Sequence, residues 1–220
     1  MVGEARGRPS EWGWMMTINR KFFFDQVRLT LFDGAFRQPQ VAGLTAILDK
    51  WERESPEADD RWLAYMLGTT HHETGRTMQP VRETFAKDDA TAIARLDAAF
   101  RAKKLTFVKT PYWRRDADGK SWLGRGYVQL TFKANYERMS KLCDVDLTTD
   151  PTRAMQPDAA LQIMFVGMRE GSFSGKKLGQ FFNGKTEDWR SARRIINGLE
   201  RADLVATHAK KYYAALSHTL

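Results

Sequence analysis

Residues 59–75 read DDRWLAYMLGTTHHETG, and this stretch decides the fold class. Its apolar and small side chains recur every three or four residues, which is the spacing of one face of an α-helix. Asp59 or Asp60 supplies an N-cap, and Gly75 is of the type that commonly ends a helix. The spacing therefore predicts a helix over 59–72 with a buried stripe of Trp62, Met66, Thr69 and Thr70, flanked by Leu63 and Leu67.

The same spacing recurs along most of the chain. It predicts helices over 39–54, over 88–102 with Asp88 as cap, around Phe132, Tyr136 and Met139, from Pro157 to Gly171, over 186–196 and over 203–217. Strand signals are scarce, although Tyr127–Leu130 reads as a short strand and 105–123 as a loop or short hairpin. We predict a mainly α fold with at most a small β-hairpin.

The domain organisation is simple, because no internal repeat or long linker interrupts the helical pattern. Residues 1–15 are interpreted as a flexible leader and residues 16–220 as a single catalytic domain. The apolar side chains near the start of the domain are expected to pack on it: Phe22, Phe23, Phe24, Leu31 and Phe32.

Composition and charge restrict the class of protein. Hydrophobic side chains make up 42% and charged ones 28% of the 220 residues, which is typical of a globular domain. The net charge of +8 favours an anionic partner. Cys143 is the only cysteine, so no intramolecular disulfide is expected. No apolar run approaches the roughly 20 residues of a membrane span, and no signal-peptide pattern opens the chain, so we expect synthesis in the cytoplasm.

Basic and aromatic residues alternate between positions 103 and 125. Such a segment can stack on sugars, bind single-stranded nucleic acid or form a solvated loop, and sugar is the partner that we favour over nucleic acid. The residues concerned are Lys103, Lys104, Lys109, Arg114, Arg115, Lys120 and Arg125, with Phe107, Tyr112, Trp113 and Trp122.

The His71-His72-Glu73 triplet raises the question of a metal site. A zinc-protease motif needs a second histidine four residues after the first, and the position that corresponds after His72 is Arg76. We therefore expect neither a metal nor another cofactor.

Glu73 and Glu83 form a candidate pair of catalytic carboxylates. Glu73 falls at the C-terminal end of a predicted helix, where the helix dipole disfavours an anion and favours the protonated carboxyl of a general acid. Pro80 breaks the helix, so Glu83 lies on a loop that can fold back opposite Glu73. Two facing carboxyls are the minimum for glycoside hydrolysis. The alternative is two surface acids partnered by Arg76 and Arg82.

The segment from Gly124 to Asn135 combines close-approach glycines with polar groups. Gly124 and Gly126 allow the backbone to pass near another surface. Gln129, Thr131 and Asn135 place amide and hydroxyl groups among apolar neighbours, where a sugar or a held water would satisfy them. A tight turn that leads into a helix is the simpler interpretation.

Three motifs together resemble glycoside hydrolase family 19, which contains chitinases and bacteriophage endolysins. They are His72-Glu73-Thr74-Gly75, then Gly124-Arg125-Gly126-Tyr127-Val128-Gln129-Leu130-Thr131 with Asn135-Tyr136, and Arg194-Ile195-Ile196-Asn197-Gly198-Leu199-Glu200. With Met78-Gln79-Pro80-Val81-Arg82-Glu83, they are most similar to the endolysin branch. The resemblance implies a lysozyme-like, two-lobed helical domain with a central cleft.

The resemblance also implies a role for individual residues. Glu73 matches the general acid, Glu83 the base and Thr131 the group that holds the attacking water. Gln129, Asn135 and Asn197 match polar groups of the sugar cleft, and Arg194 and Glu200 match a charged network behind it. His72, Tyr112 and Trp122 are added as candidate substrate-binding residues.

The sequence departs from the family pattern at three places. The spacing from Glu73 to Glu83 is one residue longer than in small bacterial members, so Asp88 and Asp89 remain alternative bases. The third motif has one glycine, Gly198, where two are usual, and Tyr127 stands in place of a proline of the chitinases.

The implied activity is inverting hydrolysis of the MurNAc–GlcNAc β-1,4 bonds of bacterial peptidoglycan, which lyses the host cell. The implied enzyme is a monomer that binds the wall, and possible binding to an anionic outer-membrane surface follows from the charge of +8. Its expected location is the host cytoplasm before lysis, with release to the periplasm through a separate membrane pore. The alternatives are a chitinase of the same family, or a catalytically inactive module that binds the cell wall or nucleic acid.

Overall fold

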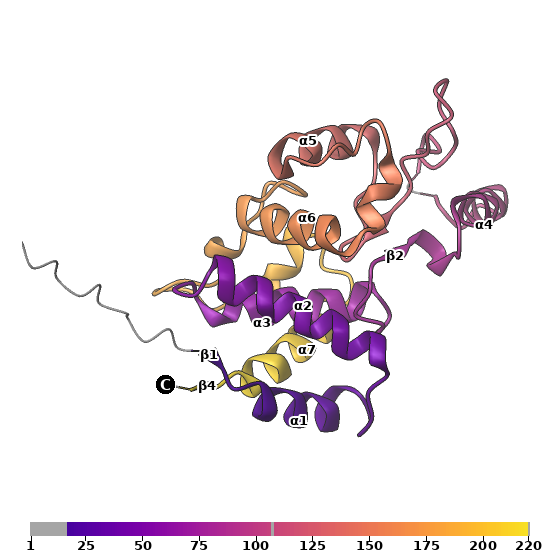
Figure 1. Ribbon diagram of the computed structural model, residues 1–220. Helices are drawn as coiled ribbons and strands as arrows, with labels where there is room; N and C mark the ends of the chain where they lie inside the picture. The colour runs from indigo at the N-terminus through magenta and orange to yellow at the C-terminus, as the bar shows by residue number, and fades with distance from the viewer. Residues whose placement is uncertain (1–16, 107, 220) are drawn as a thin grey trace, which may run out of the picture.

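The computed structural model describes residues 17–106 and 108–219, and it is mainly helical (Figure 1). The predicted leader, residues 1–15, and Phe107 lie outside the described residues. Within the described part there are seven α-helices: α1 (Arg20–Leu31), α2 (Gln38–Glu54), α3 (Asp60–Glu73), α4 (Asp89–Arg101), α5 (Lys133–Cys143), α6 (Pro157–Glu170) and α7 (Ala202–Ala215). Four 3-10 helices add to them: η1 (Glu83–Phe85), η2 (Pro151–Met155), η3 (Leu178–Gln180) and η4 (Ser191–Ile195). The mainly α prediction is confirmed.

Two small antiparallel sheets join distant parts of the chain. β1 (Thr17–Ile18) pairs with β4 (His218–Thr219), so the two ends of the domain meet. β2 (Val81–Arg82) pairs with β3 (Arg125–Gly126), with Val81 opposite Gly126. The sequence allowed at most a small β-hairpin, and neither of these pairs is a hairpin. The β2–β3 pair instead brings the loop after α3 against the glycine-rich segment.

α3 is the central helix of the fold. The Asp59 carboxylate accepts a hydrogen bond from the backbone N–H of Arg61 and caps its start. Every residue from Leu63 to His71 is buried, because α7, α2 and α6 pack around it. Gly68 permits the close contact with α7, since a Cβ there would lie 2.7 Å from the Ala209 nitrogen. The helix is thus buried on all sides rather than along one stripe.

α1 packs against α7 at the lower edge of the molecule in Figure 1. The Asn19 side chain caps α1 by accepting a hydrogen bond from the N–H of Phe22. The apolar residues of this region behave as expected in part. Phe23, Leu31 and Phe32 are buried and Phe24 is partly buried, whereas Phe22 is exposed.

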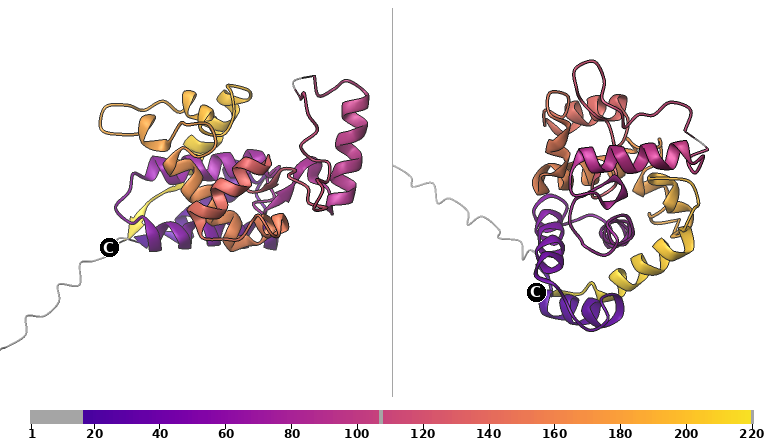
Figure 2. Two further views of the ribbon diagram at one scale, coloured as in Figure 1. Left: turned by 90° about the horizontal axis from the view of Figure 1, so that it is seen from above. Right: turned by 90° about the vertical axis from the view of Figure 1, so that its right-hand side faces the viewer.

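The hydrophobic core divides into a large and a small cluster. The small one joins α4 to the loop that follows it and consists of Ala86, Ala92, Leu96, Trp113 and Leu123. Figure 2 shows α4 standing apart from the other helices, at one end of the molecule. Of the described aromatic residues between 103 and 125, Trp113 and Trp122 are buried and Tyr112 is partly buried.

Two predicted elements are wrong. Residues 125–130 form a tight turn instead of a strand over Tyr127–Leu130, because Arg125 and Leu130 exchange both backbone hydrogen bonds and Gln129 has a φ of 56°. The helix expected over 186–196 is reduced to the 3-10 turn η4, which buries Ala192, Arg193 and Ile195. Both segments fold to place side chains near the C-terminal end of α3.

No helix of the described ranges, 17–106 and 108–219, is long and apolar enough to cross a membrane.

Candidate functional site

A cavity of about 340 Å³ lies at the C-terminal end of α3. It gathers five of the residues expected to act together: Glu73, Gln129, Thr131, Asn135 and Asn197. The remaining lining residues are Val128, Leu130, Phe132, Phe173 and Ile196. The cavity therefore combines one carboxylate with amide and hydroxyl groups, as a polar ligand such as a sugar requires.

Glu73 is held by a buried arginine. Arg193 Nη1 lies 2.6 Å from Glu73 Oε1, and the Arg193 side chain is only 4% exposed. Within the described residues only Oε1 is hydrogen-bonded, so Oε2 is the oxygen left to face a ligand. The sequence placed this carboxyl at a helix end, and the structure adds a guanidinium beside it. The ion pair therefore fixes the orientation of Glu73.

The charged network behind the cavity differs from the expected one by one residue. Arg194 is exposed, and its neighbour Arg193 makes the ion pair with Glu73. Arg193 Nε donates to the backbone carbonyl of Glu200, whereas the Glu200 side chain is exposed. The reason is the 3-10 geometry of η4, which turns Arg193 inward and Arg194 outward. Arg194 and the Glu200 carboxylate are thus not part of the site.

Glu83 is held at both of its oxygens. Tyr112 donates its hydroxyl to Oε1 at 2.6 Å, and the N–H of Gly124 donates to Oε2 at 2.8 Å. Burial and the negative charge of Glu83 raise the pKa of Tyr112 well above its ordinary value, so its hydroxyl remains a donor. The two donors fix the orientation of the Glu83 carboxylate. Tyr112 was expected to bind substrate, and its hydroxyl is instead bonded to Glu83.

Gly124 brings the base candidate and the cavity together. A Cβ at this position would lie 2.7 Å from Gln129 Oε1, 3.2 Å from Thr131 Cγ2 and 3.3 Å from Glu83 Cβ. All three side chains thus converge on one glycine, and Glu83 adjoins the cavity through Thr131 and Gln129. Gly124 is required here because no other residue leaves room for this convergence.

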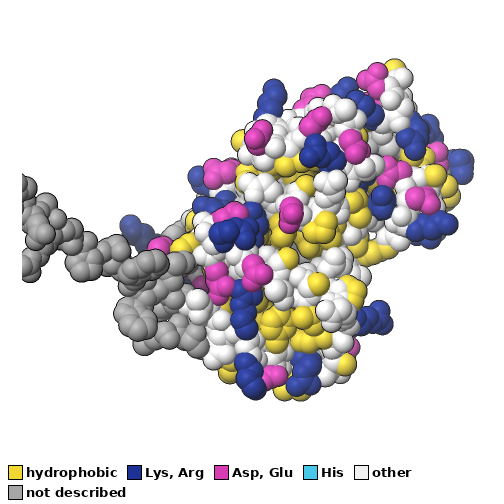
Figure 3. Space-filling model, in the orientation of Figure 1, with side chains coloured by type: hydrophobic (Ala, Val, Ile, Leu, Met, Phe, Trp, Pro, Cys, Tyr) yellow, Lys and Arg dark blue, Asp and Glu magenta, His cyan; other side chains and the backbone are white. Residues whose placement is uncertain are grey.

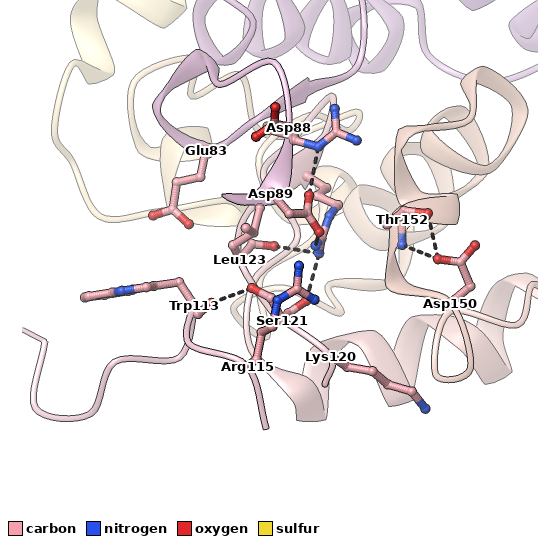
Figure 4. Close-up of polar contacts among 12 residues, drawn as sticks. Glu83, Asp88, Asp89, Trp113, Arg115, Lys120, Ser121, Leu123, Asp150 and Thr152 are labelled. Carbon is pink, nitrogen blue, oxygen red and sulfur yellow. Dashed lines mark hydrogen bonds and ion pairs between the residues drawn. The ribbon is translucent and has the colours of Figure 1, made fainter. Parts of the chain in front are cut away.

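The other acids near Glu83 already have structural partners. The Asp88 carboxylate caps α4 by accepting from the N–H of Thr91 at 2.7 Å. Asp89 forms ion pairs with Arg82 and Arg125, and these two guanidinium groups lower its pKa despite its burial. Figure 4 shows the Glu83 carboxylate turned away from Asp88 and Asp89. The geometry therefore favours Glu83 over the two alternative bases.

The amide side chains also shape the cavity wall. Gln129 Nε2 donates to the carbonyl of Val81 at 3.0 Å, and Asn135 Nδ2 donates to the carbonyl of Thr131 at 2.8 Å. Asn197 Oδ1 accepts from the N–H of Gly198. These bonds use part of each amide and fix its orientation, so the remaining polar atoms are available to a ligand.

Two further residues of the predicted site lie elsewhere. Trp122 is 5% exposed and belongs to the large core, where its ring packs edge-on against Tyr136 and its Nε1 donates to Asp116. It cannot offer a ring face to a sugar. His72 lines a different pocket, together with His208.

Two exposed phenylalanines, Phe132 in the cavity wall and Phe85 close to Glu83 in the chain, were not predicted from the sequence. Phe132 is 48% exposed, lines the cavity and lies 4.3 Å from the Tyr112 ring, centroid to centroid. Phe85 is 59% exposed, and its ring edge lies over Gly75. Phe132 directly follows Thr131, and Phe85 closely follows Glu83. This position in the sequence beside two predicted catalytic residues was the signal that could have identified them.

Four of the left-handed non-glycine residues in the described chain lie in the cavity wall or directly after Glu83. Thr84, Phe85, Gln129 and Phe132 have φ values of 61°, 53°, 56° and 68°, in the region that favours glycine. Left-handed non-glycine residues cost about 1–3 kcal/mol each and cluster at functional sites.

The described residues, 17–106 and 108–219, contain no cluster of three or more histidine, cysteine or acidic side chains that could hold a metal ion. In comparisons with known proteins, no protein-family model matches the chain and no curated protein matches its sequence.

Proposed function

We propose that the protein is an inverting glycoside hydrolase that cuts the glycan strands of bacterial peptidoglycan, as a bacteriophage endolysin does. The observation that carries this proposal is the cavity that Glu73 lines together with Gln129 and Thr131. Glu83 is not one of its lining residues, but it meets Gln129 and Thr131 at Gly124. The motif similarity to glycoside hydrolase family 19 assigns the same residues the same roles. In this proposal the large and small hydrophobic clusters are the two lobes of a lysozyme-like fold.

The proposed reaction uses the two carboxyls in different protonation states. Glu83, held by two hydrogen-bond donors, is the ionised base, and it takes a proton from a water that the Thr131 hydroxyl orients. The water oxygen bonds to the anomeric carbon as the glycosidic C–O bond breaks. Glu73 gives its proton, carried on Oε2, to the leaving oxygen. Inversion requires the carboxyls to stand roughly 6.5–9.5 Å apart to admit the water.

The remaining groups around the cavity would bind the sugars. Phe132 offers an exposed ring face next to Glu73, and aromatic rings stack on the apolar faces of sugars. Asn135 and Asn197 supply amides for hydroxyl and N-acetyl groups. These residues replace the aromatic contacts that the sequence argument assigned to Trp122 and Tyr112.

Peptidoglycan is the preferred polymer because its stem peptides carry carboxylates. The net charge of +8 attracts an anionic polymer, and Figure 3 shows Lys and Arg side chains gathered at the end of the molecule that carries α4. Chitin is neutral and gains nothing from this charge. In the endolysin role the protein would reach the wall from the host cytoplasm through a separate membrane pore.

The test compares the wild type with Glu73→Gln on purified peptidoglycan stripped of outer membrane, with colloidal chitin alongside. Glu57→Gln makes the same chemical change at an exposed position away from the cavity and is the matched control. Mass spectrometry of released fragments should detect new reducing ends from the wild type and Glu57→Gln, and none from Glu73→Gln.

Other outcomes distinguish the alternatives. Fragments from chitin but not from peptidoglycan would favour the chitinase. Equal cutting by Glu73→Gln would remove Glu73 from the mechanism. If neither polymer is cut but the protein sediments with peptidoglycan, the protein is a binding module.

A further inference from the structure

A second pocket of about 340 Å³ lies where α1, α3 and α7 meet, with α7 between the other two helices (Figure 1). It shares none of its residues with the cavity beside Glu73. Its lining residues are Thr30, Leu31, His71, His72, Gly75, Arg76, Leu204, His208 and Lys211. Every ionisable side chain in this described lining is a histidine or a cation, and none is an acid.

The histidines of the pocket are arranged on two helices. The rings of His71 on α3 and His208 on α7 lie 4.3 Å apart, centroid to centroid. His71 Nδ1 lies 3.0 Å from the Tyr212 hydroxyl, so the fold satisfies this nitrogen. His208 Nδ1 is buried and has no hydrogen-bond partner within the described residues. His208 is therefore the imidazole with a ring nitrogen that the fold leaves without a hydrogen bond.

Two cations border the same pocket. Lys211 lies one turn along α7 from His208, and its ammonium donates to the carbonyl of Thr30 at 3.1 Å. Arg76 follows α3 and pairs with the exposed carboxylate of Asp33 at 2.6 Å. An ammonium, a guanidinium and imidazoles around one cavity provide several N–H donors, and a tetrahedral oxyanion can accept from all of them.

The charge of the pocket depends on its histidines. Burial lowers the pKa of His208, and the positive charges of His72, Lys211 and Arg76 lower it further. The pKa of His72 is also lowered, chiefly by burial. The charges of Arg193 and Arg201 lower it as well, and those of Glu73 and Glu200 raise it in part. His71 has its pKa lowered to about 3, by burial and by His208, Arg76, His72 and Lys211. A bound anion would oppose these shifts at His208 and His72.

We propose that this pocket binds a phosphate group, free or carried on a sugar, through Lys211, Arg76 and His208, and that it takes up a proton as the phosphate binds. The pocket is larger than a bare phosphate, which leaves room for an attached sugar. Binding strengthens as the pH falls, because protonated His208 is the form that the anion selects. The inference is independent of the proposed hydrolase activity, since it involves neither Glu73 nor Glu83.

The test is isothermal titration calorimetry on the whole protein at about pH 6 and about pH 8, on either side of the ordinary histidine pKa. The probes are inorganic phosphate, glucose 1-phosphate, sulfate and, as a neutral control, glucose. Sulfate keeps its charge between these pH values, so its affinity isolates the titration of the protein. We expect the anions to bind at one saturable site and glucose not to bind. The affinity for sulfate should be at least tenfold weaker at the higher pH than at the lower pH.

Matched variants locate the site. Lys211→Met should weaken phosphate binding at least tenfold, whereas Lys210→Met, which removes the same charge from the neighbouring residue outside the pocket, should leave it unchanged. His208→Gln should lower the number of protons taken up when sulfate binds, which is measured by repeating the titration in buffers of different ionisation enthalpy. Tighter binding of glucose 1-phosphate than of phosphate would identify a sugar phosphate as the ligand, and the reverse would identify free phosphate.

Two results would overturn the proposal. One is the absence of saturable binding of phosphate, glucose 1-phosphate and sulfate by the wild type at about pH 6. The other is an equal loss of affinity in Lys211→Met and Lys210→Met, which would show attraction to overall charge rather than to the pocket.

Discussion

At the scale of single residues, the candidate site depends on which of two adjacent arginines is buried beside Glu73. Arg193 is buried against Glu73, and Arg194 points to solvent. The sequence motif contained both, and nothing in its spacing distinguished them, because the direction of each side chain depends on whether the segment forms an α-helix or the 3-10 turn η4. The sequence could therefore identify Glu73 as a candidate, but not its ionic partner.

Replacing Arg193 tests the orientation of Glu73. Arg193→Met should lower the rate of peptidoglycan hydrolysis on the order of 10²-fold, because a misplaced acid loses its alignment with the glycosidic oxygen. Arg193→Lys should recover part of the rate, and Arg194→Met should stay near the wild-type rate. Initial rates of dye release from labelled peptidoglycan measure this, with thermal unfolding as a check on folding. Equal effects of Arg193→Met and Arg194→Met would argue against the ion pair.

Tyr112 offers a second test at this scale. Tyr112→Phe removes only the hydroxyl that donates to Glu83 and keeps the ring beside Phe132. We expect kcat to fall about tenfold, with KM nearly unchanged and a stability loss of about 0.5–1.5 kcal/mol, the usual worth of one hydrogen bond. A rise in KM with kcat unchanged would instead support the original prediction that Tyr112 binds substrate.

At the scale of elements, local signals predicted the helices best. Asp88 caps α4 and Gly171 ends α6 in a left-handed conformation, as their residue types predicted. Segments whose shape depends on distant partners were not predictable. The 125–130 turn follows from the left-handed Gln129 and the pairing of β2 with β3, and the sequence shows neither directly.

The contact between α3 and α7 gives a prediction for stability. Gly68→Ala would place a Cβ 2.7 Å from the backbone of Ala209, so the helices must separate. Overpacking of this kind lowers the free energy of unfolding by about 1–3 kcal/mol. In a domain of this size, each kcal/mol lost lowers the Tm by roughly 2–4 °C. Gly184→Ala is the matched control, because its added methyl meets open space. Differential scanning calorimetry should show a lower Tm for Gly68→Ala only.

At the scale of the whole molecule, buried histidines couple stability to pH. The folded protein holds His71 with a pKa of about 3, chiefly because of burial, whereas the unfolded chain has the model-peptide value near 6.5. Below pH 6.5 the unfolded state therefore binds more protons, so the free energy of unfolding falls as the pH falls from about 6.5 towards 3. His208 and His72 act in the same direction.

Urea denaturation between about pH 6.5 and pH 5 measures this coupling, because most carboxylates do not titrate in that range. For each histidine that the fold keeps neutral, the free energy of unfolding falls by up to about 1.4 kcal/mol per unit decrease in pH. His71→Gln should be less stable at neutral pH, because its hydrogen bond with Tyr212 is disturbed, yet its stability should fall less steeply with acid. An unchanged slope would mean that His71 is not the neutral buried group described.

The stereochemistry of the product tests the central claim most directly, since it depends on Glu73 and Glu83 acting from opposite faces of the sugar. The measurement is proton NMR of the anomeric region during hydrolysis of a soluble peptidoglycan oligosaccharide, recorded before mutarotation. An inverting pair with water between the carboxyls predicts that the α-anomer appears first from the β-1,4 bond. Initial formation of the β-anomer would contradict the account, because retention requires a first attack on the sugar by a carboxylate or by its own N-acetyl group instead of by water.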